Sequence, residues 1–403
     1  MVSSRHFVAR YVPDMVGISV LFAIVLLLFI PMLTQMLWGR GFDYPLHLDF
    51  VRNFNEGNGE LVSYPLFHVA VLGVYSALPK LPFLETYKRA GLIVGIVLYL
   101  ITAVTLYTTY ALPGLGRQPT YKRSARAVII TLLLMLIAPI SVFSISEGHL
   151  YWGYFLPNIH MNPTLTALKP FALLLFIYVI GAFSDKAHFK TGVAVSIAIA
   201  VTILGTLAKP NYTLIMLPVI TLVGAYRLWR GQSINWWLLI VGLIIPATFI
   251  LGMQYLVLHN SPFSGGAMFF RPFAVAAEHN IQNVALKFFL SILFPLAVYS
   301  LYKSARRDTM LNLAWLIFAA GAFVSYCFVE ENRVADGNFI WSGHIAVTVL
   351  FAASITFWLR QLRFEKSVFS PTMIVCLSIL LLHALSGLFW YYADMVSPGF
   401  VWY

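Results

Sequence analysis

The stretch 41–50, Gly41-Phe42-Asp43-Tyr44-Pro45-Leu46-His47-Leu48-Asp49-Phe50, directly follows the first long apolar segment of the chain. Pro45 suits the first turn of a helix, because it lacks the N–H that would be orphaned there, and Asp43 can cap that turn. Apolar residues then recur every four positions, at Leu46, Phe50 and Phe54. The pattern predicts a short amphipathic helix on a membrane surface, with Asp43 at its start and His47 one turn in. In the alternative reading, Asp43 is only a cap and His47 only an interfacial side chain.

The composition predicts that this helix belongs to a membrane protein. Of the 403 residues, 60% are hydrophobic and 10% are charged, whereas a soluble domain carries about 25% charged residues. Apolar runs near twenty residues long recur from end to end, as membrane-spanning helices require. We therefore expect an all-α, polytopic membrane protein in which 1–403 form a single transmembrane domain, without a soluble domain. Cys327 and Cys376 lie in apolar segments and imply no disulfide framework.

The number of spans follows from where lysine and arginine lie, because short basic loops face the cytoplasm. Twelve apolar segments cover roughly 15–38, 64–79, 90–112, 127–145, 168–184, 191–208, 211–226, 236–258, 284–302, 311–329, 342–359 and 371–391. All of the basic loops face the cytoplasm only if one of the early apolar segments does not cross the membrane. As a helix, 64–79 would be about 24 Å long, short of the roughly 30 Å hydrocarbon core. The sequence thus predicts eleven spans and a long first outer loop, 39–89, that carries two interfacial helices. The N-terminus is then cytoplasmic and the C-terminus periplasmic.

The net charge of +11 is part of the same topological signal. Sixteen of the 26 lysines and arginines fall in the predicted inner loops, together with only four of the 15 acidic residues. Basic residues placed in this way orient a membrane protein, so we expect no nucleic-acid partner. No phosphate-binding loop or glycine-rich dinucleotide turn occurs either, which argues against chemistry driven by ATP or NAD.

Polar residues gather in the predicted outer loops, and polar groups kept near a membrane at a cost mark functional sites. The predicted catalytic residues are Asp43, Asp49 and His47. The predicted substrate-binding residues are His68, Glu147, Asn158, His160, Asn162, Lys169, Lys209, Asn211, Arg271, Glu331, Arg333, Asn338 and Trp341. A carboxylate here could act as a general base, cations could hold a phosphate, and aromatic rings could stack on a sugar.

Each of these assignments has a simpler structural alternative. Trp341 could be an ordinary aromatic residue of the membrane interface, and Lys169 could extend its charge past a helix end to water. Glu331 and Arg333 could form an exposed ion pair that contributes little to stability. Metal binding is equally open. The chain lacks His-Glu-x-x-His and Cys-x-x-Cys, which excludes a structural zinc site of those kinds. Asp43, His47 and Asp49 could hold a divalent cation, but their spacing is not diagnostic.

Five short motifs, in order along the chain, resemble those of the GT-C superfamily of integral-membrane glycosyltransferases. They are Asp43-Tyr44-Pro45-x-His47-Leu48, Tyr64-Pro65-Leu66-Phe67-His68, Pro157-Asn158-x-His160-x-Asn162-Pro163-Thr164 with Lys169-Pro170-Phe171, Lys209-Pro210-Asn211, and Glu331-x-Arg333-x-x-x-Gly337-Asn338-Phe339-x-Trp341. Each motif is short, and the set covers most of the chain. The GT-C architecture also has a cytoplasmic N-terminus and a long first outer loop with two helices parallel to the membrane.

The resemblance implies that a sugar is transferred from a polyprenyl-phosphate-linked donor to a glycan, lipid or protein acceptor. The reaction would take place on the periplasmic face of a bacterial inner membrane, among membrane lipids. An Asp in the first outer loop would be essential, as base or as orienter of the acceptor; in this sequence that residue is Asp43, with Asp49 second. The chain departs from familiar members in lacking an extra soluble domain. That departure leaves the acceptor open and points to an accessory partner.

Three other functions compete with this one. An O-antigen polymerase or ligase also has about a dozen spans but places its functional residues in one large later loop, whereas the acids here cluster in the first. A transporter of lipid-linked sugars would show two related halves and polar residues near the midplane, and neither is evident. An acyltransferase would need a buried histidine within the membrane, for which His383 is the single candidate and has no polar neighbours in sequence.

Overall fold

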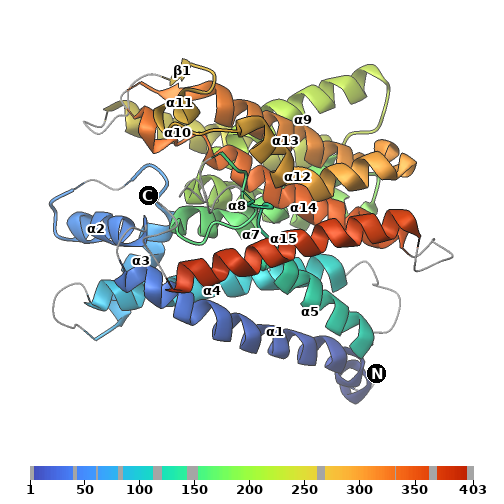
Figure 1. The fold of residues 1–403 in the computed structure, drawn as a ribbon, viewed down its shortest axis with the longest axis horizontal. Helices are drawn as coiled ribbons and strands as arrows, with labels where there is room; N and C mark the ends of the chain where they lie inside the picture. The colour runs from blue at the N-terminus through green and yellow to red at the C-terminus, as the bar shows by residue number, and fades with distance from the viewer. Residues whose placement is uncertain are drawn as a thin grey trace.

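The structure is a helical bundle with one small sheet (Figure 1). It is a computed structural model that describes residues 4–39, 43–59, 62–79, 85–111, 120–142, 153–260, 268–331, 333–362 and 370–396. Nine helices in this described part of the chain are long and apolar enough to cross a membrane. The protein is therefore an all-α membrane protein, as its composition predicts.

The long helices are α1 (Ser4–Trp38), α4 (Glu85–Ala111), α7 (Pro163–Ala182), α9 (Asn211–Trp229), the π-helical η3 (Trp237–Ile244) with α10 (Ile245–Asn260), α12 (Val284–Leu301), α13 (Thr309–Cys327), α14 (Trp341–Gln361) and α15 (Pro371–Val396). The α14 helix is the most buried and packs against α7, α9, α12 and α13. Two further predicted spans correspond to the shorter helices α5 (Tyr121–Leu136) and α8 (Gly192–Ala208).

Several short elements complete the fold. They are α2 (Asp43–Asn55), α3 (Leu66–Ala77), η2 (Ala187–Lys190), α11 (Ala274–Glu278), η4 (Lys303–Arg307), η5 (Val334–Asp336), β1 (Met268–Phe270) and β2 (Phe328–Glu330). The strands β1 and β2 pair antiparallel. The helices α2 and α3 occupy the predicted first outer loop, and at 1.5 Å per residue the 12-residue α3 reaches only about 18 Å.

The α2 helix buries a different face from the apolar one seen in the sequence. Its buried residues are Tyr44, His47, Leu48 and Val51. The predicted apolar stripe points away from the protein, with exposed fractions of 52% for Leu46, 37% for Phe50 and 39% for Phe54. An apolar stripe facing outward on a helix at the end of a membrane bundle fits a helix lying on lipid.

The predicted span 127–145 is not one continuous helix. The helix α5 ends at Leu136, and an extended segment that contains Pro139 follows, because proline cannot donate the helical hydrogen bond and its ring clashes with the preceding turn. Helix α15 satisfies the freed backbone groups. Ala138 donates its N–H to the His383 carbonyl at 3.2 Å, His383 Nδ1 donates to the Ala138 carbonyl at 2.7 Å, and Ser386 donates to the Pro139 carbonyl. His383 is thus a packing residue.

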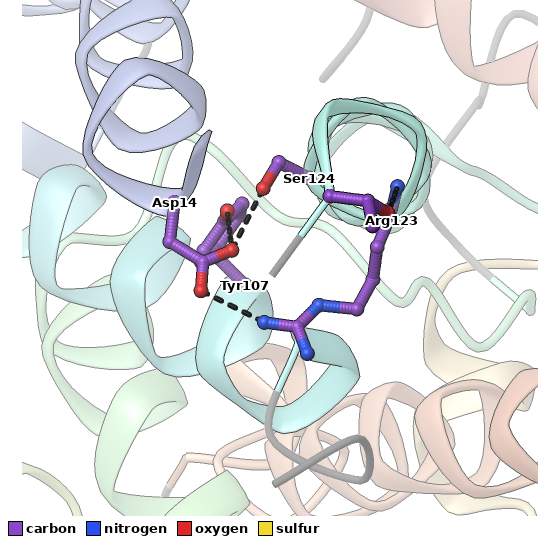
Figure 2. A network of polar contacts seen from close by, with 5 residues as sticks. Asp14, Tyr107, Arg123 and Ser124 are labelled. Atoms are coloured by element: carbon purple, nitrogen blue, oxygen red, sulfur yellow. Dashed lines mark hydrogen bonds and ion pairs between the residues drawn. The ribbon is translucent and has the colours of Figure 1, made fainter. Parts of the chain in front are cut away.

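A polar network joins α1, α4 and α5 near the start of α1 (Figure 2). The Asp14 carboxylate accepts hydrogen bonds from Tyr107 Oη at 3.1 Å, Ser124 Oγ at 2.7 Å and Arg123 Nη2 at 2.8 Å. The three donors come from two helices, so one carboxylate fixes the relative positions of three. Asp14 and Arg123 are each mostly buried.

Candidate functional site

Asp43, the first residue of α2, is held by the cap of another helix. Asn162 is the N-cap of α7, where Pro163 occupies the first helical position. The Asn162 side-chain oxygen accepts hydrogen bonds from Leu165 N and Thr164 Oγ1, both at 2.8 Å. With its oxygen occupied in this way, the amide can direct its nitrogen only outward, and Nδ2 donates to Asp43 Oδ2 at 2.6 Å. The cap of α7 therefore sets the orientation of the Asp43 carboxylate.

Lys209 reaches the same cap from the connection between α8 and α9. It precedes Pro210 and has an extended backbone, as a residue before proline favours. Its Nζ donates to Thr164 Oγ1 at 3.0 Å. The ammonium also lies 4.9 Å from the centre of the Trp341 ring and 5.2 Å from that of Tyr64, as in cation–π contacts. Lys209 and Asp43 are thus linked through Thr164 and Asn162, with no direct ion pair recorded between them among the described residues.

The two charges of this site influence each other. Burial raises the pKa of the Asp43 carboxyl above its usual range, and the Asn162 hydrogen bond and the charge of Lys209 oppose that rise. Burial lowers the pKa of the Lys209 ammonium to about 8, and the charge of Asp43 opposes that fall. A carboxylate with a raised pKa is a better base, and a desolvated cation attracts an anion more strongly than one in water.

A histidine pair lies beside Asp43 and ties α2 to α3. His47 Nδ1 and His68 Nε2 are 3.0 Å apart, so that one ring donates and the other accepts. Burial lowers the pKa of His68 to about 4, and burial together with the charges of His68 and Lys209 lowers that of His47. Both rings are therefore mainly neutral at pH 7, and a neutral ring has one nitrogen that donates and one that can accept.

A third group of predicted residues lies around the start of α14. Asn211 Nδ2 donates to the Asn338 carbonyl at 3.0 Å and to Ser342 Oγ at 3.1 Å. The Asn338 side chain in turn donates to Glu330 Oε2 at 2.8 Å. Trp341, in the first turn of α14, joins this group to Lys209 through its ring. The structure thus brings Asp43, Asn162, Lys209 and Trp341 into one cluster, with Asn211 and Asn338 next to it.

Other predicted residues lie deeper in the bundle. Lys169 Nζ donates to Asn158 Oδ1 at 2.8 Å, and the Asn158 amide donates to two backbone carbonyls at the end of α5 and just beyond it. His160 bonds through Nδ1 to the Tyr99 hydroxyl at 2.8 Å. Lys169 and Asn158 border a cavity of about 10 Å³, which is room for about one water molecule. Lys169 does not extend to the surface, because its ammonium has a partner inside.

The remaining predicted residues lie apart from the cluster. Asp49 forms an exposed ion pair with Arg52 at 3.3 Å. Arg333 pairs with Asp336 at 2.6 Å, and Glu331 is exposed next to Glu330. Arg271 directly follows β1, with its guanidinium over the Phe269 ring. Glu147 lies outside the described residues.

The described residues include no group of three His, Cys, Asp or Glu side chains that could hold a metal ion. Of the three residues considered for a cation, Asp43 bonds to Asn162, His47 to His68 and Asp49 to Arg52. They point to three different partners, so they do not form a joint ligand set.

Two members of the site were missed in the sequence. Thr164 links Lys209 to Asn162, and Glu330, rather than Glu331, bonds to Asn338. The signal for Thr164 was its place two residues after a helix-capping Asn, where a hydroxyl commonly joins the cap. Nothing in the sequence distinguishes Glu330 from Glu331, because only the strand pairing of β2 decides which side chain faces Asn338.

Comparison of this sequence with protein-family models and with curated proteins finds no match. The fold and the site define a helical membrane protein with a partly buried carboxylate and a buried ammonium joined through a helix cap. The functional argument therefore depends on the chemistry of these residues.

Proposed function

We propose that this protein is a membrane glycosyltransferase that takes its sugar from a polyprenyl-phosphate-linked donor. The observation that supports the proposal best is the chain of contacts Asp43–Asn162–Thr164–Lys209. It holds one candidate base and one candidate phosphate-binding cation on the same helix cap, next to the exposed apolar stripe of α2. A lipid-linked sugar phosphate needs these features together: a base for the acceptor, a cation for the phosphate and a lipid surface for the tail.

In the proposed reaction, the acceptor hydroxyl gives its proton to the Asp43 carboxylate. The acceptor oxygen bonds to the anomeric carbon of the sugar as the bond from that carbon to the phosphate oxygen breaks. Polyprenyl phosphate leaves with the bonding electron pair, and the charge of Lys209 stabilises the negative charge that it gains. Trp341 and Tyr64, which already flank Lys209, offer aromatic faces for the sugar ring.

The proposed topology completes the proposal. With α5 and α8 added to the nine long apolar helices, the chain would cross a bacterial inner membrane eleven times, with a cytoplasmic N-terminus and a periplasmic C-terminus. α2 and α3 would then lie on the periplasmic surface, and the transfer would take place there. The acceptor would be a glycan, a lipid or a protein.

The test starts from the lipid that purifies with the protein. Mass spectrometry of that lipid should show a polyprenyl phosphate that carries a hexose or pentose. With that donor, Asp43→Asn should reduce release of polyprenyl phosphate at least about a hundredfold, since general bases contribute that much or more. The control is Glu56→Gln, an exposed carboxylate just beyond α2, which should retain activity. Normal turnover by a folded Asp43→Asn variant would refute the catalytic assignment.

A further inference from the structure

The strand β1, which Arg271 directly follows, carries an exposed aromatic surface. We call it the β1 surface and define it by the exposed residues Met268, Phe269, Phe270, Phe273 and Phe323. Their exposed fractions are 59%, 37%, 60%, 52% and 55%. Apolar patches of adjoining residues, unlike single exposed ones, mark a surface that meets a partner or a membrane.

The backbone holds these side chains outward. β1 pairs with β2 along one edge, with Met268 opposite Glu330 and Phe270 opposite Phe328. Beyond the strand, Arg271 N donates to the Cys327 carbonyl at 2.9 Å and Phe273 N to that of Tyr326 at 2.6 Å. Phe273 has a left-handed backbone with φ of 59°, which a bulky residue adopts only where its surroundings impose it. The segment from β1 to Phe273 is therefore fixed to the end of α13 in a defined position.

The β1 surface is continuous with the outer face of a membrane-spanning candidate. The Phe270 ring lies 6.4 Å from the ring of Phe323, which belongs to α13. Leu316, two turns earlier on α13, is also exposed, by 48%. Whatever contacts the apolar outer face of α13 therefore also contacts Phe270. For a helix long and apolar enough to cross a bilayer, the contacting medium is lipid.

Arg271 supplies a charge at the edge of this surface. Its guanidinium lies 5.8 Å from the centre of the Phe269 ring, and the part of the chain that the structure describes provides no carboxylate in ion-pair contact with it. Other outer arginines differ, since Arg89 pairs with Glu85 at 3.3 Å and Arg333 with Asp336 at 2.6 Å. A guanidinium beside interfacial aromatic rings is suited to a phosphate at headgroup level.

We propose that the β1 surface inserts into the interfacial layer of the bilayer and that Arg271 binds the phosphate of a bilayer phospholipid. This proposal does not depend on the proposed sugar transfer. It gives Arg271 the role of anchoring the outer end of α13, apart from the cluster around Asp43 and Lys209.

The insertion is tested by photocrosslinking in nanodiscs of defined phospholipid that contain no polyprenyl lipid. p-Benzoylphenylalanine replaces Phe270, a near-isosteric change at an exposed position, and in a control it replaces exposed Glu331. After irradiation, mass spectrometry should show a phospholipid adduct at position 270 and none at 331. Absence of the adduct at 270, or equal adducts at both positions, would overturn the proposal.

The role of Arg271 is tested by the phospholipid that stays bound. Native mass spectrometry of Arg271→Gln should show at least a threefold loss of retained anionic phospholipid, and Arg271→Lys should lose less. Arg89→Gln removes another exposed outer arginine, one that already has a carboxylate partner, so it should leave retention unchanged. Equal losses in Arg271→Gln and Arg89→Gln would show that only bulk charge matters and would overturn the specific contact.

Discussion

Lys209 is buried, and no carboxylate of the described residues is in direct contact with it. Its proton is therefore easier to lose than that of a surface lysine. Its donor contact is a neutral hydroxyl, Thr164 Oγ1. Such a position is costly for a structural lysine, because burial of a charge needs compensation. It is useful for one that meets an anionic substrate and gains its counter-charge on binding.

This position predicts a pH dependence of donor binding. Burial lowers the pKa of Lys209 to about 8, so the ammonium is present below that pH and is lost as the pH rises through it. The KM for the lipid-linked donor should therefore rise roughly tenfold per pH unit above about 8. Lys209→Arg keeps its charge at these pH values, so the rise in KM should begin at a higher pH in this variant. A KM that is flat from pH 7 to 9.5 in the wild type would contradict the prediction.

The residues of the site were only partly predictable from the sequence. Asp43 and Lys209 stood out because each lies in a predicted outer loop with a proline one or two residues after it. The inward position of Lys169 was not predictable, since a lysine near a helix end can turn either to water or to an internal partner such as Asn158. The link through Asn162 depends on two segments more than a hundred residues apart, which local pattern does not encode.

At the scale of the elements, the polar network on α5 fixes three helices through one carboxylate. Asp14 accepts three hydrogen bonds, and hydrogen bonds to a charged group contribute about 1.5–3 kcal/mol when buried. Because Asp14 and Arg123 retain some exposure, we expect a smaller total cost on removal, about 1–2 kcal/mol.

Asp14→Asn should therefore lower the thermal unfolding temperature in detergent measurably. Its matched control is Asp185→Asn, which removes an acid from a more exposed ion pair, with Lys190 at 3.7 Å. That change should have little effect, as is usual for exposed pairs. Indistinguishable melting of the two variants would show that the Asp14 network does not stabilise the packing of α1, α4 and α5.

The apolar stripe of α2 was recognised, and its outward direction fits the predicted helix on a membrane surface. The opposite face, which packs on the protein through Tyr44 and His47, was not predicted. In a membrane protein an apolar stripe can face lipid as well as protein, so periodicity alone does not assign it. The break after Leu136 followed from Pro139, whose effect depends on whether another helix can supply the missing hydrogen bonds.

At the scale of the whole molecule, the positions of α2 and α3 determine the topology. If α3 does not cross, residues on both sides of it share one face of the membrane. Asn58→Cys and Ser76→Cys, both at exposed positions, should then react with a membrane-impermeant thiol reagent added to intact cells. Ser304→Cys, in η4, should react only after the cells are opened. Protection of position 76 in intact cells would contradict the eleven-span arrangement. Labelling of the unsubstituted protein measures the background from Cys327 and Cys376.

The extended segment after α5 also has a consequence for how the chain is made. The carbonyls of Ala138 and Pro139 obtain their partners from His383 and Ser386, on the last helix of the described chain to be synthesised. Until the ribosome has released α15, those carbonyls have no place in bare hydrocarbon. We therefore expect the nascent α5 to stay in contact with the translocon or a chaperone until α15 has been made. A chain whose synthesis stops before Pro371 should therefore stay incompletely folded and be recognised by membrane quality control.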